Sequence, residues 1–214
     1  GVFVFQSTGV SLEEMRGCAL PDEFAPAMLI NANDSYLARL FTVIHELVHI
    51  FLGESAVTGD VSHSPSFLSV TSIEGFCNAV AAEVLVPMSD FASQIPANWH
   101  SNAEAVIARN ARRYWVSRQV IAIRLVEAGI ADRKWLSKIW PTLQTLRPKA
   151  KPAKIQQHVM ALARVGASFS RLAVSSYYGN LIHGAQLARL LQMRLRHLPK
   201  LEAAVFNRGA ASSA

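Results

Sequence analysis

The clearest hydrophobic pattern in the chain runs from about Ser35 to Leu52. Apolar residues recur there three and four positions apart, as they do on the buried face of an α-helix. These residues are Leu37, Leu40, Phe41, Ile44, Leu47, Val48, Phe51 and Leu52. Asp34 and Ser35 are suitable N-cap residues, and Gly53 is a typical stop. The pattern therefore predicts a core helix over this segment.

Short apolar runs precede this helix, and helical patterns follow it over most of the chain. Strands are predicted at Val2–Phe5, Cys18–Leu20 and Ala27–Asn31, with Asp22 and Pro26 between them. Further helices are predicted at 71–86, 103–114, 117–128, 132–140, 155–178, 183–192 and 199–206. These elements indicate an α+β fold with a small, largely antiparallel sheet beside the first helix, followed by an all-helical extension.

The best linker candidate is 141–154, which contains Arg147-Pro148-Lys149-Ala150-Lys151-Pro152. We accordingly predict a domain at 1–140, a linker at 141–154 and a basic helical region at 155–208. The chain starts at Gly1, without an initiator methionine and directly in a predicted strand. We therefore expect that an N-terminal part of the protein is missing.

Composition places the chain among ordinary globular proteins. Hydrophobic residues make up 51% of the 214 positions, which is ample for a packed core. Two cysteines do not make a disulfide framework. There is no run of 18 apolar residues, and the first residues do not resemble a signal peptide. We expect a cytoplasmic protein without a membrane partner.

Charge is divided unevenly between the two halves of the chain. Residues 1–100 contain two basic and eleven acidic residues, a net charge of −9, whereas the remainder contains 19 basic and four acidic residues, a net charge of +15. Such asymmetry is typical of proteins with a nucleic-acid or acidic-protein partner. The helices around Ser117 and Gly129, and around Gly179 and Gly184, could form helix-turn-helix units. We favour solvated basic helix faces, including Arg118 and Arg124, over direct nucleic-acid binding.

The predicted helix at 35–52 carries His45-Glu46-Leu47-Val48-His49, a His-Glu-x-x-His motif. Histidines four positions apart lie on one helix face, so both imidazoles can reach one tetrahedral zinc ion. Glu46 would lie beside the metal, where a carboxylate can take a proton from water that the metal has acidified. Such a match also occurs by chance on solvated helices. The neighbouring apolar stripe favours a metal site, because buried imidazoles need a partner.

A zinc hydrolase usually has a third protein ligand, and several downstream residues could supply it. The candidates are Glu54, Asp60, His63, Glu74 and Glu83. We prefer Glu74, which opens the predicted helix at 71–86. A competing interpretation is a capping box at Thr71-Ser72-Ile73-Glu74, in which Glu74 would merely bond the backbone of Thr71. Spacing alone leaves both interpretations open.

Two segments resemble the ImmA/IrrE family of bacterial zinc metallopeptidases. They are His45 to Ser55 and Glu74-Gly75-Phe76-Cys77-Asn78-Ala79-Val80-Ala81-Ala82-Glu83-Val84-Leu85-Val86-Pro87. The resemblance implies a zincin-like fold, in which Glu74 joins His45 and His49 as the third ligand of one zinc ion. Glu46 would be the catalytic base. Asn78 would orient neighbouring groups or be structural, because amides are poor zinc ligands.

The resemblance also implies an activity and a partner. Members of the family typically cleave or inactivate a helix-turn-helix transcriptional repressor in phage, mobile-element, stress-response or toxin–antitoxin systems. We therefore expect a zinc endopeptidase that hydrolyses a peptide bond in such a protein. A different class of function competes with this one: a non-proteolytic regulator with structural or sensory zinc, acting through the basic C-terminal half on a protein or nucleic acid. Glu46 distinguishes the two, because a structural zinc site does not need this carboxylate.

Overall fold

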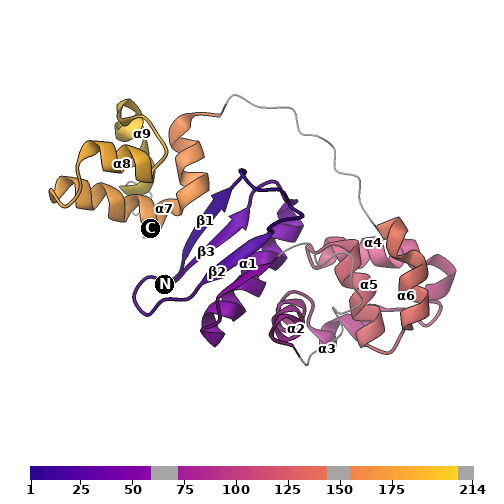
Figure 1. The fold of residues 1–214 in the computed structure, drawn as a ribbon. Helices are drawn as coiled ribbons and strands as arrows, with labels where there is room; N and C mark the ends of the chain where they lie inside the picture. The colour runs from indigo at the N-terminus through magenta and orange to yellow at the C-terminus, as the bar shows by residue number, and fades with distance from the viewer. Residues whose placement is uncertain (59–71, 144–154, 207–214) are drawn as a thin grey trace, which may run out of the picture.

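The computed structural model describes residues 1–58, 72–143 and 155–206, and it has an α+β fold as predicted (Figure 1). A four-stranded sheet contains β1 (Phe3–Ser7), β2 (Gly17–Leu20), β3 (Ala27–Asn31) and β4 (Ala56–Thr58). The first three strands match the predicted ones closely. The fourth, which follows the predicted core helix, was not foreseen because it contains only three residues.

The strand order is β1-β3-β2-β4, and the sheet is mixed rather than wholly antiparallel. Strand β2 pairs antiparallel with both β3 and β4, as the prediction of a small antiparallel sheet requires. Strand β1, however, pairs parallel with β3. The chain passes from β1 to β2 and then returns through β3, which inserts between them. Strand β2 runs opposite to β1, and β3 runs opposite to β2, so β3 has the same direction as β1.

Helices α1 (Tyr36–Leu52) and α7 (Gln157–Tyr178) cover opposite faces of this sheet. The strand register places Gly17, Ala19, Met28 and Ile30 on one face, which α1 covers. Side chains alternate between the two faces along a strand, so Phe3 and Phe5 lie on the other one. Phe169 of α7 meets both rings edge to face there, with centroids 5.8 and 5.1 Å away. The face under α1 is therefore buried, whereas the face under α7 is only partly buried.

A second helical group follows α1 and has its own core. It comprises α2 (Ile73–Leu85), α3 (Met88–Phe91), α4 (Ala103–Arg113), α5 (Arg118–Glu127) and α6 (Arg133–Ile139). Short 3₁₀ helices occupy 92–94, 99–102 and 140–143. The fully buried side chains at the centre of the core include Phe91, Ile121 and Leu125. The predicted helices in this part are confirmed to within two residues.

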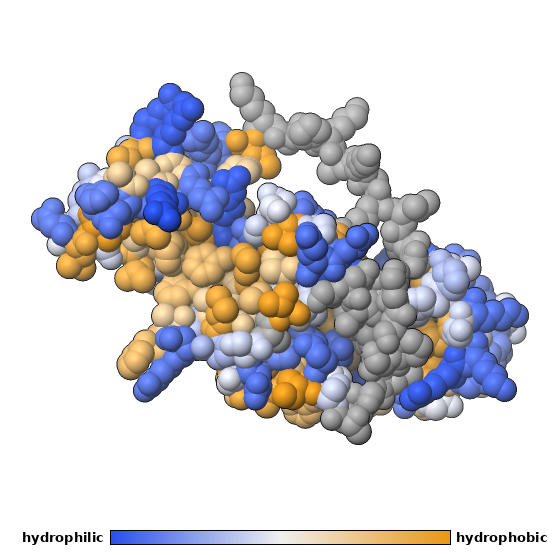
Figure 2. Space-filling model, viewed as in Figure 1, coloured by the Kyte–Doolittle hydropathy of each residue, from blue (hydrophilic) through white to orange (hydrophobic). Residues whose placement is uncertain are grey.

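The C-terminal helices form a third packed group around α7. This helix is interrupted at Gly166, whose φ of 74° is a left-handed conformation that favours glycine. Helices α8 (Gly184–Leu190) and α9 (Leu198–Phe206) pack with α7 around a core that includes Leu187, Leu191 and Leu201. On the face drawn in Figure 2, hydrophilic side chains gather over these helices and over α4–α6, at the two ends of the molecule.

The predicted linker at 141–154 lies mostly outside the described residues; its first three residues end the 3₁₀ helix at Trp140–Leu143. The division into a domain, a linker and a C-terminal region therefore stays a prediction. No helix in the described parts of the chain is long and apolar enough to cross a membrane.

The aromatic contact between α7 and the sheet gives a stability prediction. Replacing Phe169 with alanine removes both edge-to-face contacts and leaves a gap against Phe3 and Phe5. Because Phe169 is only partly buried, we expect the free energy of unfolding to fall by roughly 2 kcal/mol, below the range for a fully buried phenylalanine. Chemical denaturation measures this value. Phe24→Ala, at a side chain that is 88% exposed, is the control, and equal losses in the two variants would contradict the packing.

Candidate metal centre

Helix α1 places both histidines of the His-Glu-x-x-His motif on one buried face. The helix begins after Ser35, whose hydroxyl accepts a hydrogen bond from the Ala38 amide at 3.2 Å. It ends at Gly53, which adopts φ 72° and donates its amide to the last turn. His45 and His49 are each only 1% exposed, and their Nε2 atoms are 3.1 Å apart. Both imidazoles therefore face the same point beside the helix.

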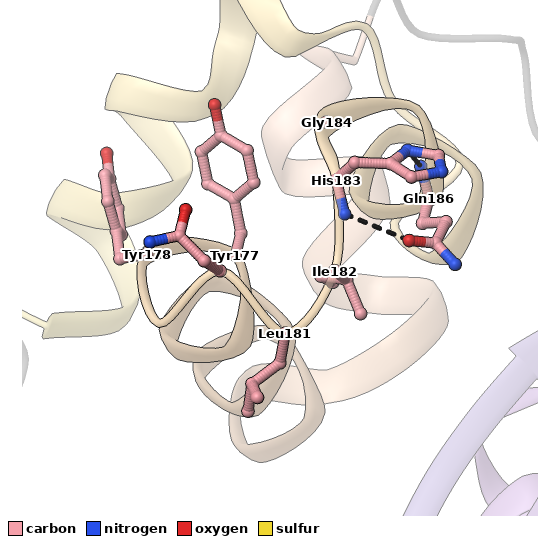
Figure 3. A pocket seen from close by; sticks show the side chains of 8 residues that line it. Tyr177, Tyr178, Leu181, Ile182, His183, Gly184 and Gln186 are labelled. Atoms are coloured by element: carbon pink, nitrogen blue, oxygen red, sulfur yellow. Dashed lines mark hydrogen bonds between the residues drawn. The ribbon is translucent and has the colours of Figure 1, made fainter.

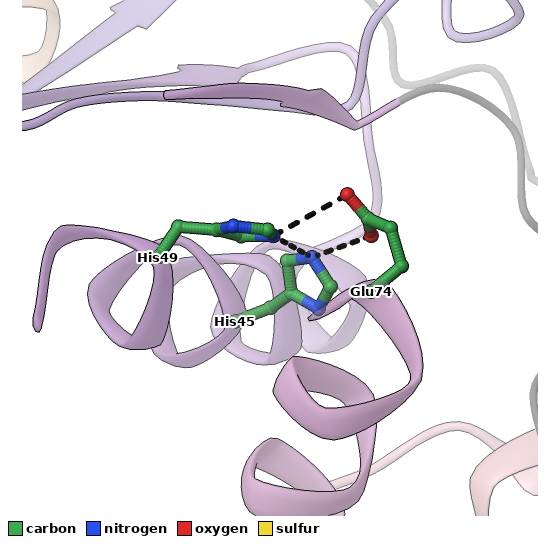
Figure 4. Close-up of side chains that lie close together, drawn as sticks. All are labelled: His45, His49 and Glu74. Carbon is green, nitrogen blue, oxygen red and sulfur yellow. Dashed lines mark hydrogen bonds and ion pairs between the residues drawn. The ribbon is translucent and has the colours of Figure 1, made fainter. Parts of the chain in front are cut away.

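Glu74, in the first turn of α2, completes this cluster (Figure 4). One carboxylate oxygen lies 3.2 Å from Nε2 of His45 and the other lies 3.4 Å from Nε2 of His49. The N-cap of α2 is Ser72, whose hydroxyl accepts a hydrogen bond from the Gly75 amide at 3.0 Å. The carboxylate of Glu74 is thus directed at the two histidines, which favours the ligand interpretation over the capping box.

The electrostatics of the cluster suit a cation. The hydrogen bond with His45 is the main cause that lowers the pKa of Glu74 and so keeps its carboxylate ionised. Burial, followed by the neighbouring His45, lowers the pKa of His49 and favours its neutral form. A neutral imidazole and an ionised carboxylate are the forms that bind metals.

Glu46 lies on α1 beside the cluster and is completely buried. Neither of its carboxylate oxygens has a hydrogen-bond partner among the residues that the structure describes. Burial raises the pKa of Glu46 to about 6. The nearby hydroxyl of Thr58 and the charge of His45 act to lower this pKa, whereas the charge of Glu74 adds to the rise. An unpaired buried carboxylate is costly unless something else at the site interacts with it.

The three side chains fit one metal ion. Their nearest ligand atoms all lie within 4.8 Å of one another, so a single ion can contact all three. Two imidazoles and one carboxylate form the donor set of a catalytic zinc site with one open position. The unpaired oxygens of Glu46 next to these donors also suit a site that holds a cation and water. The chemistry of the residues present therefore agrees with a hydrolytic metal centre.

The other candidate ligands do not join this cluster where the structure describes them. Glu54 is exposed, and Asp60 and His63 lie outside the described residues. Glu83 accepts hydrogen bonds from the Met88 amide, at 3.1 Å, and from the guanidinium of Arg124. Glu83 therefore belongs to the far end of α2.

Arg124 corrects an expectation from the sequence. Its side chain is only 5% exposed, and it also bonds Glu127 at 2.7 Å and the Val86 carbonyl at 2.6 Å. It was expected on a solvated helix face, but it connects α5 to the end of α2. Helical spacing could not reveal this, because the partners Glu83 and Val86 lie about 40 residues earlier. Arg118, by contrast, lies on a solvated helix face as expected, where it pairs with the exposed Glu104.

Two neighbours of Glu74 on α2 are buried. Asn78, one turn further along, is 4% exposed, and its Oδ1 has no hydrogen-bond partner in the described part of the chain. Cys77 is fully buried, and burial, followed by the charges of Glu74 and Glu46, raises the pKa of its thiol to about 11. A thiol with so high a pKa stays protonated at neutral pH, so Cys77 suits packing better than metal binding.

Sequence reasoning missed Gly17, which lies against Glu46 and Thr42 from strand β2. The predicted strand began at Cys18, so the glycine stood outside it. A glycine within a strand often marks a close approach of the backbone to another group. A glycine at the start of a predicted strand could therefore have marked Gly17 as a site of close approach. It could not have shown that the approaching group is Glu46.

A hollow of about 540 Å³ lies elsewhere, at the turn between α7 and α8 (Figure 3). It is lined by Tyr177, Tyr178, Asn180, Leu181, Ile182, His183, Gly184 and Gln186. None of these residues belongs to the His45, His49 and Glu74 cluster, which is the group of potential metal ligands found among the described residues. We therefore place the chemistry at the cluster and not at this hollow.

Comparison with known proteins agrees with the geometry. Neither the curated proteins nor the solved structures gave a match. Residues 6–126, more than half of the chain, match a peptidase family that is described as the IrrE N-terminal-like domain. The matched range begins within β1 and contains the other three strands, α1 and α2, which carry the cluster, and the helices that follow as far as α5. The chain therefore belongs to the IrrE N-terminal-like family, which supports a metallopeptidase-type function.

Proposed function

We propose that this protein is a zinc-dependent endopeptidase that hydrolyses a peptide bond in a partner protein. The observation that carries the proposal is the convergence of His45, His49 and Glu74 on one point, with the buried Glu46 beside them. A merely structural metal site would need the three ligands but not this unpaired carboxylate. Membership of a peptidase family supports the same conclusion.

Zinc is the metal that best suits the donors. Imidazole nitrogens together with a carboxylate oxygen are typical zinc ligands, whereas magnesium and calcium prefer oxygen ligands alone. We propose that His45 and His49 bind one zinc ion through their Nε2 atoms and that Glu74 binds it through its carboxylate. When bound, the ion supplies Lewis acidity, which polarises a peptide carbonyl and makes water more acidic.

Glu46 would move the protons of the reaction. With a pKa of about 6, its carboxyl is mostly ionised at pH 7 and can accept a proton from the attacking water at one of its free oxygens. The resulting carboxylic acid can then donate this proton to the nitrogen of the departing amine. A group with a pKa near the working pH serves well in both directions. Burial of Glu46 also keeps bulk water away from the transferred proton.

For the partner, we propose a helix-turn-helix transcriptional repressor in the cytoplasm, cut in a phage, mobile-element, stress-response or toxin–antitoxin system. This part rests on the resemblance to the ImmA/IrrE family. The natural test substrate is a repressor encoded beside the gene for this protein. A competing proposal is regulation without proteolysis through the basic C-terminal half. Positive charge is concentrated in the C-terminal half around His197, where the exposed side chains are Arg194, Arg196 and Lys200.

Removing the third ligand should abolish tight zinc binding. We expect the wild-type protein to bind about one zinc ion and Glu74→Ala to bind it far more weakly, because two imidazoles alone leave half of a tetrahedral site to solvent. Metal analysis after dialysis, followed by competition with a chromophoric chelator, measures both quantities. Glu54→Ala is the matched control, since Glu54 is an exposed carboxylate just after the end of α1 and outside the cluster. Unchanged zinc affinity in Glu74→Ala would exclude Glu74 as a ligand.

Removing the proposed base should stop cleavage without releasing zinc. Glutamine at position 46 keeps the shape of the side chain but cannot accept a proton, so we expect Glu46→Gln to cut the repressor about 10²- to 10⁴-fold more slowly. The assay follows cleavage of the purified repressor, with zinc content measured on the same preparation and Glu54→Gln as the control.

Each alternative outcome of this experiment has a distinct meaning. Cleavage at the wild-type rate by zinc-loaded Glu46→Gln would show that Glu46 is not the base. If neither form cuts the repressor but both relieve repression, the non-proteolytic regulator is the correct function.

A further inference from the structure

Gly17 in β2 lies directly against the carboxyl group of Glu46. A Cβ atom built on Gly17 would be 2.5 Å from Cγ2 of Thr42 and 2.9 Å from Cδ of Glu46, and it would be closer still to a carboxylate oxygen of Glu46. Real Cβ atoms essentially never approach other heavy atoms within 3.0 Å. The three nearest atoms all belong to these two side chains of α1, so one of them must move if position 17 carries a side chain.

The backbone at Gly17 has little freedom to withdraw. Strand β2 is paired on both edges, and Gly17 stands opposite Ile30 of β3 and Thr58 of β4. Ile30 and Thr58 are both buried. A shift of Gly17 away from α1 would therefore disturb two strand pairings at once.

Thr42 is also held in place. Its hydroxyl donates a hydrogen bond to the Ala38 carbonyl at 3.0 Å, which fixes the direction of its methyl group. The carboxyl of Glu46, by contrast, has the Thr58 side chain near it but no hydrogen bond of normal geometry among the described residues. A side chain at position 17 would therefore displace the carboxyl of Glu46 most readily.

We propose that Gly17 is a positioning residue: the absence of its side chain creates the space that holds the Glu46 carboxyl beside the two histidines. Any larger residue at this position would move the carboxyl and impair proton transfer, while the metal ligands stay where they are. The catalytic part of this inference rests on the proposed function. The contact between Gly17 and Glu46 does not.

The competing explanation is purely structural. Gly17 could be required only because α1 packs closely on β2, so that a side chain clashes with Thr42 and loosens the helix. Thr42→Ser separates the two explanations, because it removes the methyl group that would clash and keeps a hydroxyl that can bond Ala38. The double variant Gly17→Ala/Thr42→Ser then retains only the conflict with Glu46.

The first experiment compares Gly17→Ala, Thr42→Ser and the double variant with Cys18→Ala, whose position is on the opposite face of the sheet. We expect zinc content to equal that of the wild type in all four. Cleavage should fall by at least about 100-fold in Gly17→Ala and stay low in the double variant, since the base is still displaced. Wild-type cleavage by Gly17→Ala, or recovery of cleavage in the double variant, would overturn the proposal.

The second experiment needs no activity and uses the metal-free protein. Gly17→Ala should lower the thermal midpoint in the Thr42→Ser background, and this loss should largely disappear when Glu46→Ala removes the carboxyl. An equal loss with and without the Glu46 side chain would overturn the proposal. Gly17→Ala alone could fail to fold. In that case the proposal requires that the triple variant Gly17→Ala/Thr42→Ser/Glu46→Ala folds, because both conflicting groups have been removed. A triple variant that does not fold would also overturn the proposal.

These two readouts separate the inference from the proposed function. If the wild-type protein cleaves no substrate, the endopeptidase proposal fails. The thermal comparison still decides whether Gly17 holds the Glu46 carboxyl in place.

Discussion

The packing of α1 between the sheet and α2 is the constraint on which the candidate site depends. One side of α1 faces β2 and β3, and another side contacts α2, which brings Glu74 to the two histidines. This arrangement removes His45, Glu46 and His49 from water almost completely. Burying three ionisable side chains on one helix is expensive unless they interact with one another or with a ligand. The fold buries these three side chains together at the candidate metal centre.

The sheet contributes to the site as well as to stability. Its face under α1 carries small residues at Gly17 and Ala19, which let the helix approach closely. Its other face carries Phe3 and Phe5, which pack against Phe169 of α7. The C-terminal helices therefore support the sheet from the side opposite the metal centre. Helix α7, from the basic half of the chain, thus contacts β1 of the acidic half.

Local patterns in the sequence predicted much of this architecture. The spacing of apolar residues between Leu37 and Leu52, with Ser35 before them and Gly53 after them, fixed both ends of α1. The same reasoning located the later helices, because amphipathic periodicity and capping are local properties. The pairing of His45 with His49 is also local, since it follows from one helical turn. Glu74 needed the resemblance to a family, because spacing could not separate a ligand from a capping residue.

Features that depend on distant parts of the chain were not accessible in this way. The parallel pairing of β1 with β3 follows from the order in which strands insert, which no short segment encodes. Arg124 looked like a surface residue because its partners Glu83 and Val86 belong to another helix and the turn after it. Gly17 acquires its meaning only when α1 is placed on β2. In each case the missing information was a tertiary contact.

X-ray diffraction on zinc-loaded crystals can show directly whether one zinc ion binds between α1 and α2. Anomalous difference maps from data collected on either side of the zinc absorption edge locate the metal without relying on activity. We expect one strong peak in contact with Nε2 of His45, Nε2 of His49 and the carboxylate of Glu74, with the Glu46 carboxyl beside it but not bound. A peak at other residues, or an empty cluster in crystals of the zinc-loaded protein, would contradict it.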